Sequence, residues 1–242
     1  MKSLPPYAFR APIKFRMPTS KNLVPIRLDI EVDGHRFKDA FTWNPTDPDS
    51  EVTIFAKRTV RDLKLPPTFI SPITQSIQTQ LSEFCSFQGQ DMHAREKILP
   101  IKLDLCVNST VVRDQFLWDL GNFDSDPEDF AKIFCDDMNI TDPQVGPAIA
   151  VSIREQLYEM AIQNVAFARE YRIGKKSRRG FDPIVNSSKA STNALDLSKF
   201  FGSKGSAIRK RREWDMYDPI VDILSNEEVV ALDARDKNSR PV

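Results

Sequence analysis

The sequence has few of the residues on which most catalytic and metal sites depend. Its 242 residues include two histidines, His35 and His93, and three cysteines, Cys85, Cys106 and Cys135. The cysteines are far apart and odd in number, which excludes a CxxC zinc spacing and argues against a disulfide framework. There is no glycine-rich phosphate loop, no HExxH and no GxSxG sequence. We therefore expect a protein that is not an enzyme and that binds no cofactor or metal.

Long hydrophobic runs are absent as well. No segment approaches the roughly 18 consecutive apolar residues of a membrane-spanning helix. The first residues, MKSLPPYAFRAP, lack the apolar stretch of a secretory signal peptide. These two absences, together with the unpaired cysteines, predict an intracellular protein in a reducing compartment.

An excess of either charge is also missing, but the balance hides a strong segregation. The 34 Lys and Arg equal the 34 Asp and Glu. Residues 171–213 carry twelve basic and three acidic side chains, a net charge of +9, whereas residues 1–170 have a net charge of −5 and residues 214–242 of −4. The basic segment is rich in Ser, Gly and Asn. This composition predicts a basic flexible linker over residues 172–213.

An internal repeat organises the first two-thirds of the chain, and a repeat has to be recognised first because it determines the fold. Shifting the sequence by 75 residues aligns apolar, aromatic and acidic positions together. The identical pairs include Pro25 and Pro100, Ile26 and Ile101, Leu28 and Leu103, Asp29 and Asp104, Asp39 and Asp114, Phe41 and Phe116, Trp43 and Trp118, and the tripeptides Phe55-Ala56-Lys57 and Phe130-Ala131-Lys132.

Each repeat begins with a pattern typical of a β-hairpin. Apolar and charged residues alternate over residues 26–32, which indicates a half-buried strand. Asp33-Gly34 then provides two residues that tolerate positive φ, as a two-residue hairpin turn requires. The returning strand carries Phe37, Phe41 and Trp43 on its apolar face. The second repeat has the same pattern around Asn108-Ser109.

Two helices follow in each repeat. Asp126 before Pro127 predicts a capped helix start. The second helix is expected to start at Pro72 or Pro147, with one apolar stripe, and to end near Tyr171 in the second repeat. The apolar residues expected on the first helix of repeat two are Phe130, Ile133, Phe134 and Met138; those on the second helices are Ile73, Ile77, Leu81 and Phe84, matched by Ile149, Ile153, Leu157 and Met160.

The sequence therefore predicts an α+β protein made of two tandem ββαα repeats. Because a unit of about 60 residues buries only about 60% of its surface, each repeat is expected to lean on its twin or on a partner. The predicted divisions are an N-terminal segment 1–22, repeat one 23–86, a connector 87–98, repeat two 99–171, the linker 172–213 and a C-terminal docking segment 214–242.

The C-terminal segment combines an apolar patch with a helix start. Ser225-Asn226-Glu227-Glu228 is a capping box, which predicts a helix through about Asp236. A helix this short needs a docking surface. That surface lies either on this protein or on a partner. The apolar residues of the patch are Trp214, Tyr217, Ile220, Ile223 and Leu224.

Acidic residues stand at two unusual places. Asp39 and Asp114 lie on the apolar face of the second strand of each repeat. We favour bonds to nearby backbone N–H groups over a partner contact, because buried carboxylates persist only when paired. The pair Asp136-Asp137 is interpreted as a solvated helix end.

The segments VPIRLDIEVDGHRFKDAFTW and LPIKLDLCVNSTVVRDQFLWD resemble the paired repeats of the SNF-five (INI-one) family, core subunits of SWI/SNF chromatin-remodelling complexes. The resemblance covers residues 23–171 and, more loosely, 213–228. It implies a nuclear, non-catalytic scaffold subunit that regulates transcription. Its expected partners are SWIRM-domain subunits, the remodelling ATPase subunit and the histones of the nucleosome. The residues expected to contact partners are Asp39, Phe41, Trp43, Asp114, Phe116 and Trp118.

The chain departs from the family at both ends. Only about 22 residues precede the first strand, so we expect no N-terminal winged-helix domain for DNA. Animal-type members are similar to the segment 234–240 and continue into an arginine-rich helix that binds the acidic patch of the histone octamer. The sequence here ends at Val242, so the resemblance leaves that anchor in doubt, with Arg240 as at most a remnant.

Two basic clusters remain as candidates for nuclear import or for contact with phosphate or an acidic protein surface, rather than a merely solvated linker. The second cluster is expected to replace the missing nucleosome anchor. The alternative function is a free-standing DNA-binding transcription regulator, which the acidic repeats disfavour. The clusters are Lys175, Lys176, Arg178 and Arg179, and Arg209, Lys210, Arg211 and Arg212.

Overall fold

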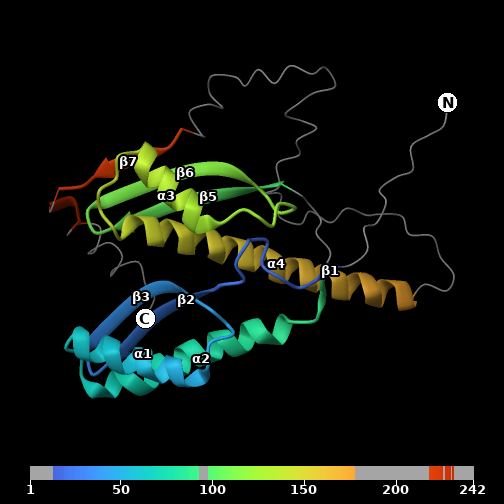
Figure 1. Ribbon diagram of the computed structural model, residues 1–242, viewed down its shortest axis with the longest axis horizontal. Helices are drawn as coiled ribbons and strands as arrows, with labels where there is room; N and C mark the ends of the chain where they lie inside the picture. Colours follow the sequence, from blue (N-terminus) through green and yellow to red (C-terminus); the bar gives the residue numbers. More distant parts are fainter. Residues whose placement is uncertain (1–12, 93–97, 178–217, 226, 230, 232–242) are drawn as a thin grey trace. The chain divides into compact units, whose positions relative to one another are not determined.

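The computed structural model describes residues 13–92, 98–177, 218–225, 227–229 and 231 (Figure 1). The chain divides into two compact units. The first unit contains repeat one and the helical residues from Leu157 onward, and the second contains repeat two up to Gln156 and the C-terminal segment. The division falls within a single long helix.

Repeat one has the predicted ββαα order. Strands β2 (Val24–Val32) and β3 (His35–Trp43) form an antiparallel hairpin, and helices α1 (Asp49–Asp62) and α2 (Ile70–Phe87) follow, joined through the short 3-10 helix η1 (Pro67–Phe69). Both α-helices lie on the same side of the hairpin in Figure 1. The α+β fold class is thus confirmed for this repeat.

Repeat two copies this order. Strands β5 (Ile98–Val107) and β6 (Thr110–Asp119) form the hairpin, and helices α3 (Pro127–Asp137) and α4 (Val145–Ser177) follow. A third strand, β7 (Ile220–Ile223), pairs with the outer edge of β6, so this sheet has the order β5-β6-β7. The C-terminal segment therefore docks, in its described part, on this protein.

The hairpin turns fall where the sequence predicts them. Val32 pairs with His35, which leaves Asp33 and Gly34 as a two-residue turn, and both have positive φ, 51° and 77°. In repeat two only the first turn residue, Asn108, has positive φ, 53°. Two turn geometries thus close equivalent hairpins, since glycine permits positive φ at the second position.

The core of each repeat lies between the first strand and the second helix. Ile26 and Leu28 of β2 are at most 1% exposed, as is Ile77 of α2. The predicted stripes are largely confirmed, because Ile73, Phe84, Ile149, Ile153 and Leu157 are also fully buried. Such burial provides the main stabilisation of the repeats, roughly 1.5–3 kcal/mol for each large aliphatic side chain.

Several helix predictions need correction. The second helices begin at Ile70 and Val145, two residues before the predicted prolines, because proline fits anywhere in a first turn. Helix α4, expected to end near Tyr171, continues to Ser177. Ile133 was expected on the buried face of α3 but is 60% exposed, since α3 turns Ala131 and Phe134 inward.

The predicted cap of α3 is also wrong in its chemistry. Asp126 occupies the N-cap position and Pro127 the first helical position, but the Asp126 side chain makes no capping hydrogen bond. Its carboxylate Oδ1 instead accepts a hydrogen bond from Arg154 Nη2 at 2.9 Å. The buried cation competes successfully with the backbone N–H groups because a charge without a partner is costly to bury.

A small third sheet joins the flanks of repeat one. Strand β1 (Ile13–Lys14) pairs antiparallel with β4 (Asp91–Met92). The Phe15 amide then donates to the Gln90 carbonyl at 2.8 Å, and the Phe15 ring contacts the Phe84 ring edge-on at 5.5 Å. These contacts fix both ends of the repeat to α2.

The predicted capping box after β7 is confirmed. The Ser225 amide donates to Glu228 Oε2 at 2.9 Å, and the Glu228 amide donates to Ser225 Oγ at 3.4 Å. Residues 227–229 and 231 are helical. Trp214 and Tyr217 of the expected apolar patch lie outside the described residues. Among the described helices, none is long and apolar enough to cross a membrane.

Candidate interaction surface

An aromatic cluster occurs in each repeat, and we call it the aromatic shelf. In repeat one it consists of Phe41 and Trp43 of β3 and Phe55 of α1, with ring centroids 4.8 Å apart for Phe41 and Phe55 and 5.5 Å for Trp43 and Phe55. All three side chains are half-buried. The shelf is therefore packed well enough to be rigid and still offers aromatic surface.

Repeat two builds the same shelf from Phe116, Trp118 and Phe130. The Phe116 and Phe130 rings are 4.3 Å apart and the Trp118 and Phe130 rings 6.0 Å. Phe134 extends this cluster, with its ring 6.2 Å from Phe130. Trp118 is 6% exposed, so this second shelf is the more deeply covered of the two.

Phe55 and Phe130 were not among the residues expected to contact partners. The sequence did contain a signal, because both belong to the Phe-Ala-Lys tripeptide that the repeats share. Phe130 was expected only as one of the apolar residues of the first helix of repeat two. The structure places each one across from the two strand aromatics of its own repeat.

Asp39 and Asp114 border the shelves. Each lies two residues before the shelf phenylalanine on the same strand face, and each accepts a hydrogen bond from the next backbone N–H, that of Ala40 at 2.8 Å and that of Gln115 at 2.7 Å. Partial burial raises the pKa of both carboxyl groups, and the backbone hydrogen bond opposes this rise. The expected backbone bond is thus present in both repeats.

The shelf tryptophans have an unusual feature in common. Trp43 Nε1 and Trp118 Nε1 are buried, and neither has a hydrogen-bond partner among the residues that the structure describes. An unpaired buried donor costs about 1–3 kcal/mol, so its occurrence at two equivalent positions is notable. The rings are held by aromatic packing in spite of this cost.

A second contact that both repeats share was not predicted, and we call it the glutamine clasp. Gln80 of α2 accepts a hydrogen bond from the Arg27 amide at 3.0 Å and donates one to the Arg27 carbonyl at 2.9 Å. Gln156 of α4 makes the same two bonds with Lys102, at 3.1 and 2.7 Å. The clasp satisfies the outward amide and carbonyl of one residue, Arg27 or Lys102, on the edge of β2 and β5 that faces away from the hairpin partner.

A buried ion cluster distinguishes repeat two. Arg154 of α4 has no exposed surface, and its Nε and Nη2 atoms donate to the Glu128 carboxylate at 2.7 and 2.6 Å. Together with the bond to Asp126, one guanidinium holds two carboxylates at the start of α3. This arrangement fixes α3 against α4, and it explains why Asp126 does not cap its own helix.

The hairpin turn of repeat two also has side-chain contacts with the segment before α4. Asn108 Nδ2 donates to Asp142 Oδ2 at 2.9 Å and to Gln144 Oε1 at 3.1 Å. The bond from Asn108 lowers the pKa of Asp142, and the Gln144 backbone N–H adds to this effect. The turn is thereby attached to the residues just before α4.

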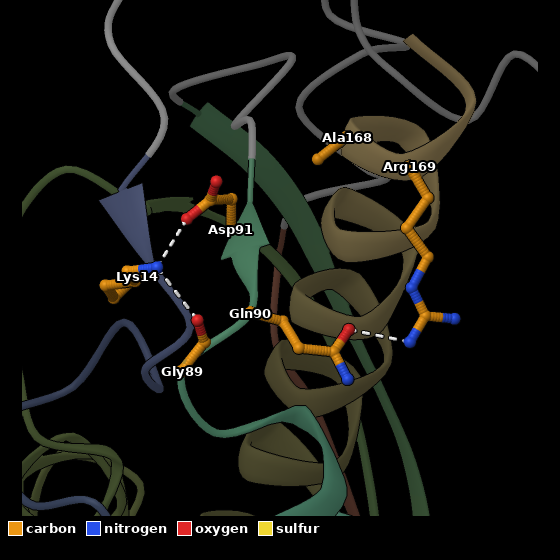
Figure 2. Close-up of a pocket in the computed structure, with 6 residues that line it drawn as sticks. All are labelled: Lys14, Gly89, Gln90, Asp91, Ala168 and Arg169. Carbon is orange, nitrogen blue, oxygen red and sulfur yellow. Dashed lines mark hydrogen bonds and ion pairs between the residues drawn. The ribbon is translucent and has the colours of Figure 1, made fainter. Parts of the chain in front are cut away.

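One pocket of about 220 Å³ lies in the first unit (Figure 2). Lys14 Nζ bonds to Asp91 Oδ1 at 2.8 Å and to the Gly89 carbonyl at 2.9 Å, and Arg169 Nη2 bonds to Gln90 Oε1 at 2.6 Å. The pocket is smaller than typical small-molecule sites, and its charged groups are already engaged. We interpret these contacts as structural ones that attach α4 to the loop before β4.

The basic clusters are mostly beyond the described part of the chain. Lys175 and Lys176 belong to the last turn of α4, and the other six basic residues of the two clusters lie outside the described residues. Asp136 and Asp137 are exposed at the end of α3, as expected. Within the described ranges, no group of three or more His, Cys, Asp or Glu side chains is arranged to hold a metal ion.

Comparison with known proteins agrees with this architecture of paired units. The chain is 61% identical over 237 residues to the chromatin structure-remodeling complex protein BSH of Arabidopsis thaliana, covering 98% of both sequences. It is 36% identical over 156 residues to the SWI/SNF chromatin-remodeling complex subunit SNF5 of Saccharomyces cerevisiae, which covers 58% of this chain and 17% of the yeast protein.

A protein-family model gives two consecutive matches. The model is described as SNF5 / SMARCB1 / INI1, and it matches residues 17–98 and 91–196, one match for each ββαα repeat. The two matches together span most of the chain. The protein therefore belongs to the SNF5 / SMARCB1 / INI1 family.

Proposed function

We propose that this protein is a non-catalytic core scaffold subunit of a SWI/SNF-type ATP-dependent chromatin-remodelling complex in the nucleus. One relative that it resembles is named as a chromatin structure-remodeling complex protein, and another as a SWI/SNF chromatin-remodeling complex subunit. The feature of the chain itself that supports a binding role is the duplicated aromatic shelf, because half-buried aromatic residues are enriched in protein interfaces. Each shelf offers one docking surface, so one chain binds two partner domains.

The partners in this proposal are SWIRM-domain subunits. Each shelf presents aromatic rings with one aspartate at its border, Asp39 or Asp114. A partner with an apolar contact surface and a cation near its rim complements this chemistry. ATP hydrolysis belongs to a separate ATPase subunit of the complex, and this chain holds the assembly together to regulate transcription.

A charge-reversal experiment tests the shelf proposal. Full-length protein carrying Asp39→Lys and Asp114→Lys is mixed with a purified SWIRM-domain subunit, and the affinity is measured by titration calorimetry. We expect at least about tenfold weaker binding, because like charges at the rim oppose a cation of the partner. The matched control carries Asp62→Lys and Asp137→Lys, equivalent exposed positions at the ends of α1 and α3.

Circular dichroism establishes that both variant proteins are folded. Equal affinity of the two variants for the SWIRM-domain subunit would contradict docking at the shelves. Tight binding of the unmodified chain alone to duplex DNA at physiological salt would instead favour a free-standing DNA-binding transcription regulator.

Nucleosome contact is assigned in this proposal to the basic clusters. Residues 171–213 carry a net charge of +9, which attracts DNA phosphates and acidic histone surfaces. Reversing Arg209, Arg211 and Arg212 to Glu is expected to weaken nucleosome binding by the assembled complex and to reduce the salt dependence of that binding. Unchanged nucleosome affinity would leave the clusters a role in nuclear import.

A further inference from the structure

The two hairpins differ at one edge. In repeat two, β7 pairs with β6 through Val111 and Arg113, which lie opposite Asp222 and Ile220. The residues at the same positions of repeat one are Arg36 and Lys38 of β3. In the part of the chain that the structure describes, β3 pairs only with β2. Within the described ranges, repeat two therefore has an added strand at a position where repeat one has none.

The direction of the backbone groups on β3 follows from contacts already established. The amide and carbonyl of Arg27 point away from β3, as their hydrogen bonds to Gln80 show. Ala40 is the partner of Arg27, so its amide points to the opposite edge, where Asp39 binds it. Backbone direction alternates along a strand, and the groups of Arg36 and Lys38 therefore also point outward.

The occupied edge of repeat two indicates what such a strand looks like. Val221 lies opposite Val112, which has no exposed surface, on the core face of the sheet. Asp222 lies on the outer face beside Val111 and one pairing step from Arg113, which is itself 3.1 Å from Asp104 of β5. On the outer face, Arg113 thus has Asp104 as its ion-pair partner on β5, whereas on β7 Ile220 lies directly opposite and Asp222 lies diagonally across.

The outer face of the repeat-one hairpin has the acidic residue on the first strand but, among the described residues, no third strand that could supply a second one. Arg36 forms an ion pair with Asp29 of β2, and Lys38 lies directly opposite Asp29. His35, Arg36 and Lys38 are all exposed. Phe37, at the position of Val112, is 7% exposed on the core face. This edge therefore fits a strand that has an acidic residue facing outward between two β-branched residues.

We propose that the β3 edge of repeat one is a docking site for an extended segment of a partner protein, which pairs antiparallel with Arg36 and Lys38 as β7 pairs with β6. The segment carries a carboxylate beside these two cations and a β-branched residue beside Phe37. Main-chain hydrogen bonds provide the affinity and the alternating side chains the specificity.

A segment of this chain itself resembles β7. Residues 182–186 read Asp-Pro-Ile-Val-Asn, similar to Asp-Pro-Ile-Val-Asp at 218–222. This segment has Asn186 where β7 has Asp222, so it lacks the charge that complements Arg36 and Lys38. A partner segment that supplies the carboxylate fits the edge better, and the test below separates the two occupants.

The experiment uses the full chain, isotopically labelled for amide NMR, and a synthetic peptide that copies residues 218–225. In the isolated chain, we expect the Arg36 and Lys38 amides to exchange with solvent at least about tenfold faster than those of Val111 and Arg113, which β7 protects. Added peptide is expected to shift the Arg36 and Lys38 resonances and slow their exchange. The same peptide with Asp222→Lys should bind more weakly.

A proline variant tests the backbone contact. Lys38→Pro removes the outward N–H, and proline is tolerated on a strand edge that faces solvent. Lys38→Thr is the matched control, because it removes the charge and keeps the N–H. We expect the threonine variant to retain most of its peptide binding and the proline variant to lose it. If Lys38→Pro fails to fold, the exchange measurement on the unmodified chain still decides the question.

Three results would overturn the proposal. One is slow exchange of the Arg36 and Lys38 amides in the isolated chain at low concentration, which would mean that residues of the same chain cover the edge. Another is protection that develops only as the chain dimerises, which would make a second copy the occupant. The third is a peptide that binds without affecting β3. None of these results involves the aromatic shelf, so the proposal can fail independently of SWIRM binding.

Discussion

The two repeats share a frame and differ in how that frame is reinforced. Both have a hairpin, an aromatic shelf and a glutamine clasp at equivalent positions. Repeat two adds the Arg154 ion cluster, the Asn108 turn contacts and the strand β7. Repeat one has Gln78 at the position of Arg154 and Asp33 at that of Asn108. The contacts that both repeats share belong to the common fold. The contacts found only in repeat two give it more internal support than repeat one has among the described residues.

The largest expected difference concerns Arg154. Arg154→Met leaves the buried Asp126 and the half-buried Glu128 without their cation, which should destabilise repeat two by about 3–5 kcal/mol. The matched change in repeat one, Gln78→Met, affects an exposed side chain and should stay within about 0.5 kcal/mol. Urea unfolding of each variant measures both values. Equal effects would contradict the view that only repeat two depends on a buried ion cluster.

Loss of the glutamine clasp should affect the two repeats alike. Gln80→Ala or Gln156→Ala removes the partner of one strand amide and one carbonyl. Because these groups lie on an exposed strand edge and can bond to water instead, we expect a cost of about 0.5–1.5 kcal/mol in each case. Hydrogen exchange of the Arg27 and Lys102 amides should become faster in the respective variant. Gln75→Ala, an exposed position on α2, is the control. A large effect in one repeat only would show that the clasps are not equivalent.

The Asn108 contacts give a smaller, pH-dependent difference. Asn108→Gly keeps a residue that tolerates the positive φ and removes the side-chain donor that lowers the pKa of Asp142. The Asp142 pKa should therefore rise toward its ordinary value, as measured by NMR titration. A carboxyl whose pKa is lower in the folded than in the unfolded chain stabilises the fold at pH values above its unfolded pKa. The variant should therefore be less stable than the unmodified protein at neutral pH, and this difference should vanish as the pH falls through the pKa of Asp142. Asp33→Gly in repeat one should shift no carboxyl in this way.

The smallest effect concerns the two shelf aspartates, where the repeats should agree again. Burial raises the pKa of Asp39 and Asp114, so the folded state holds their protons more tightly than the unfolded chain. Their ionisation therefore costs stability as the pH rises through the raised pKa values. Asp39→Asn and Asp114→Asn should each slightly raise the melting temperature at neutral pH and leave it unchanged near pH 3. A melting temperature that falls at neutral pH would mean that the ionised carboxylate bond to the next amide outweighs burial.

Much of the architecture could be predicted because it depends on local periodicity. Alternation over residues 26–32 and the Asp33-Gly34 turn specify a hairpin without knowledge of its surroundings. Because the repeats align at an offset of 75 residues, each element predicted in one repeat also predicts its counterpart in the other. The shelf residues Phe41 and Trp43 were found because aromatic residues at matching strand positions are rare.

The contacts that were missed depend on tertiary packing. Gln80 and Gln156 are ordinary helix residues, and only the approach of a helix to a strand edge gives them partners. Arg154 was not recognised because a charged residue on a helix is usually solvated. The strand β7 has four residues with their apolar side chains largely exposed, so its pairing comes from the open edge of β6 more than from its own sequence.

The glutamine clasp also limits how many strands each hairpin can recruit. A two-stranded hairpin has two edges, and open edges on both sides would permit successive addition of strands, the geometry of an aggregate. By occupying the backbone of Arg27 and Lys102, the clasp closes one edge at its centre. Only the opposite edge can accept a strand, so each repeat can add one strand and no more.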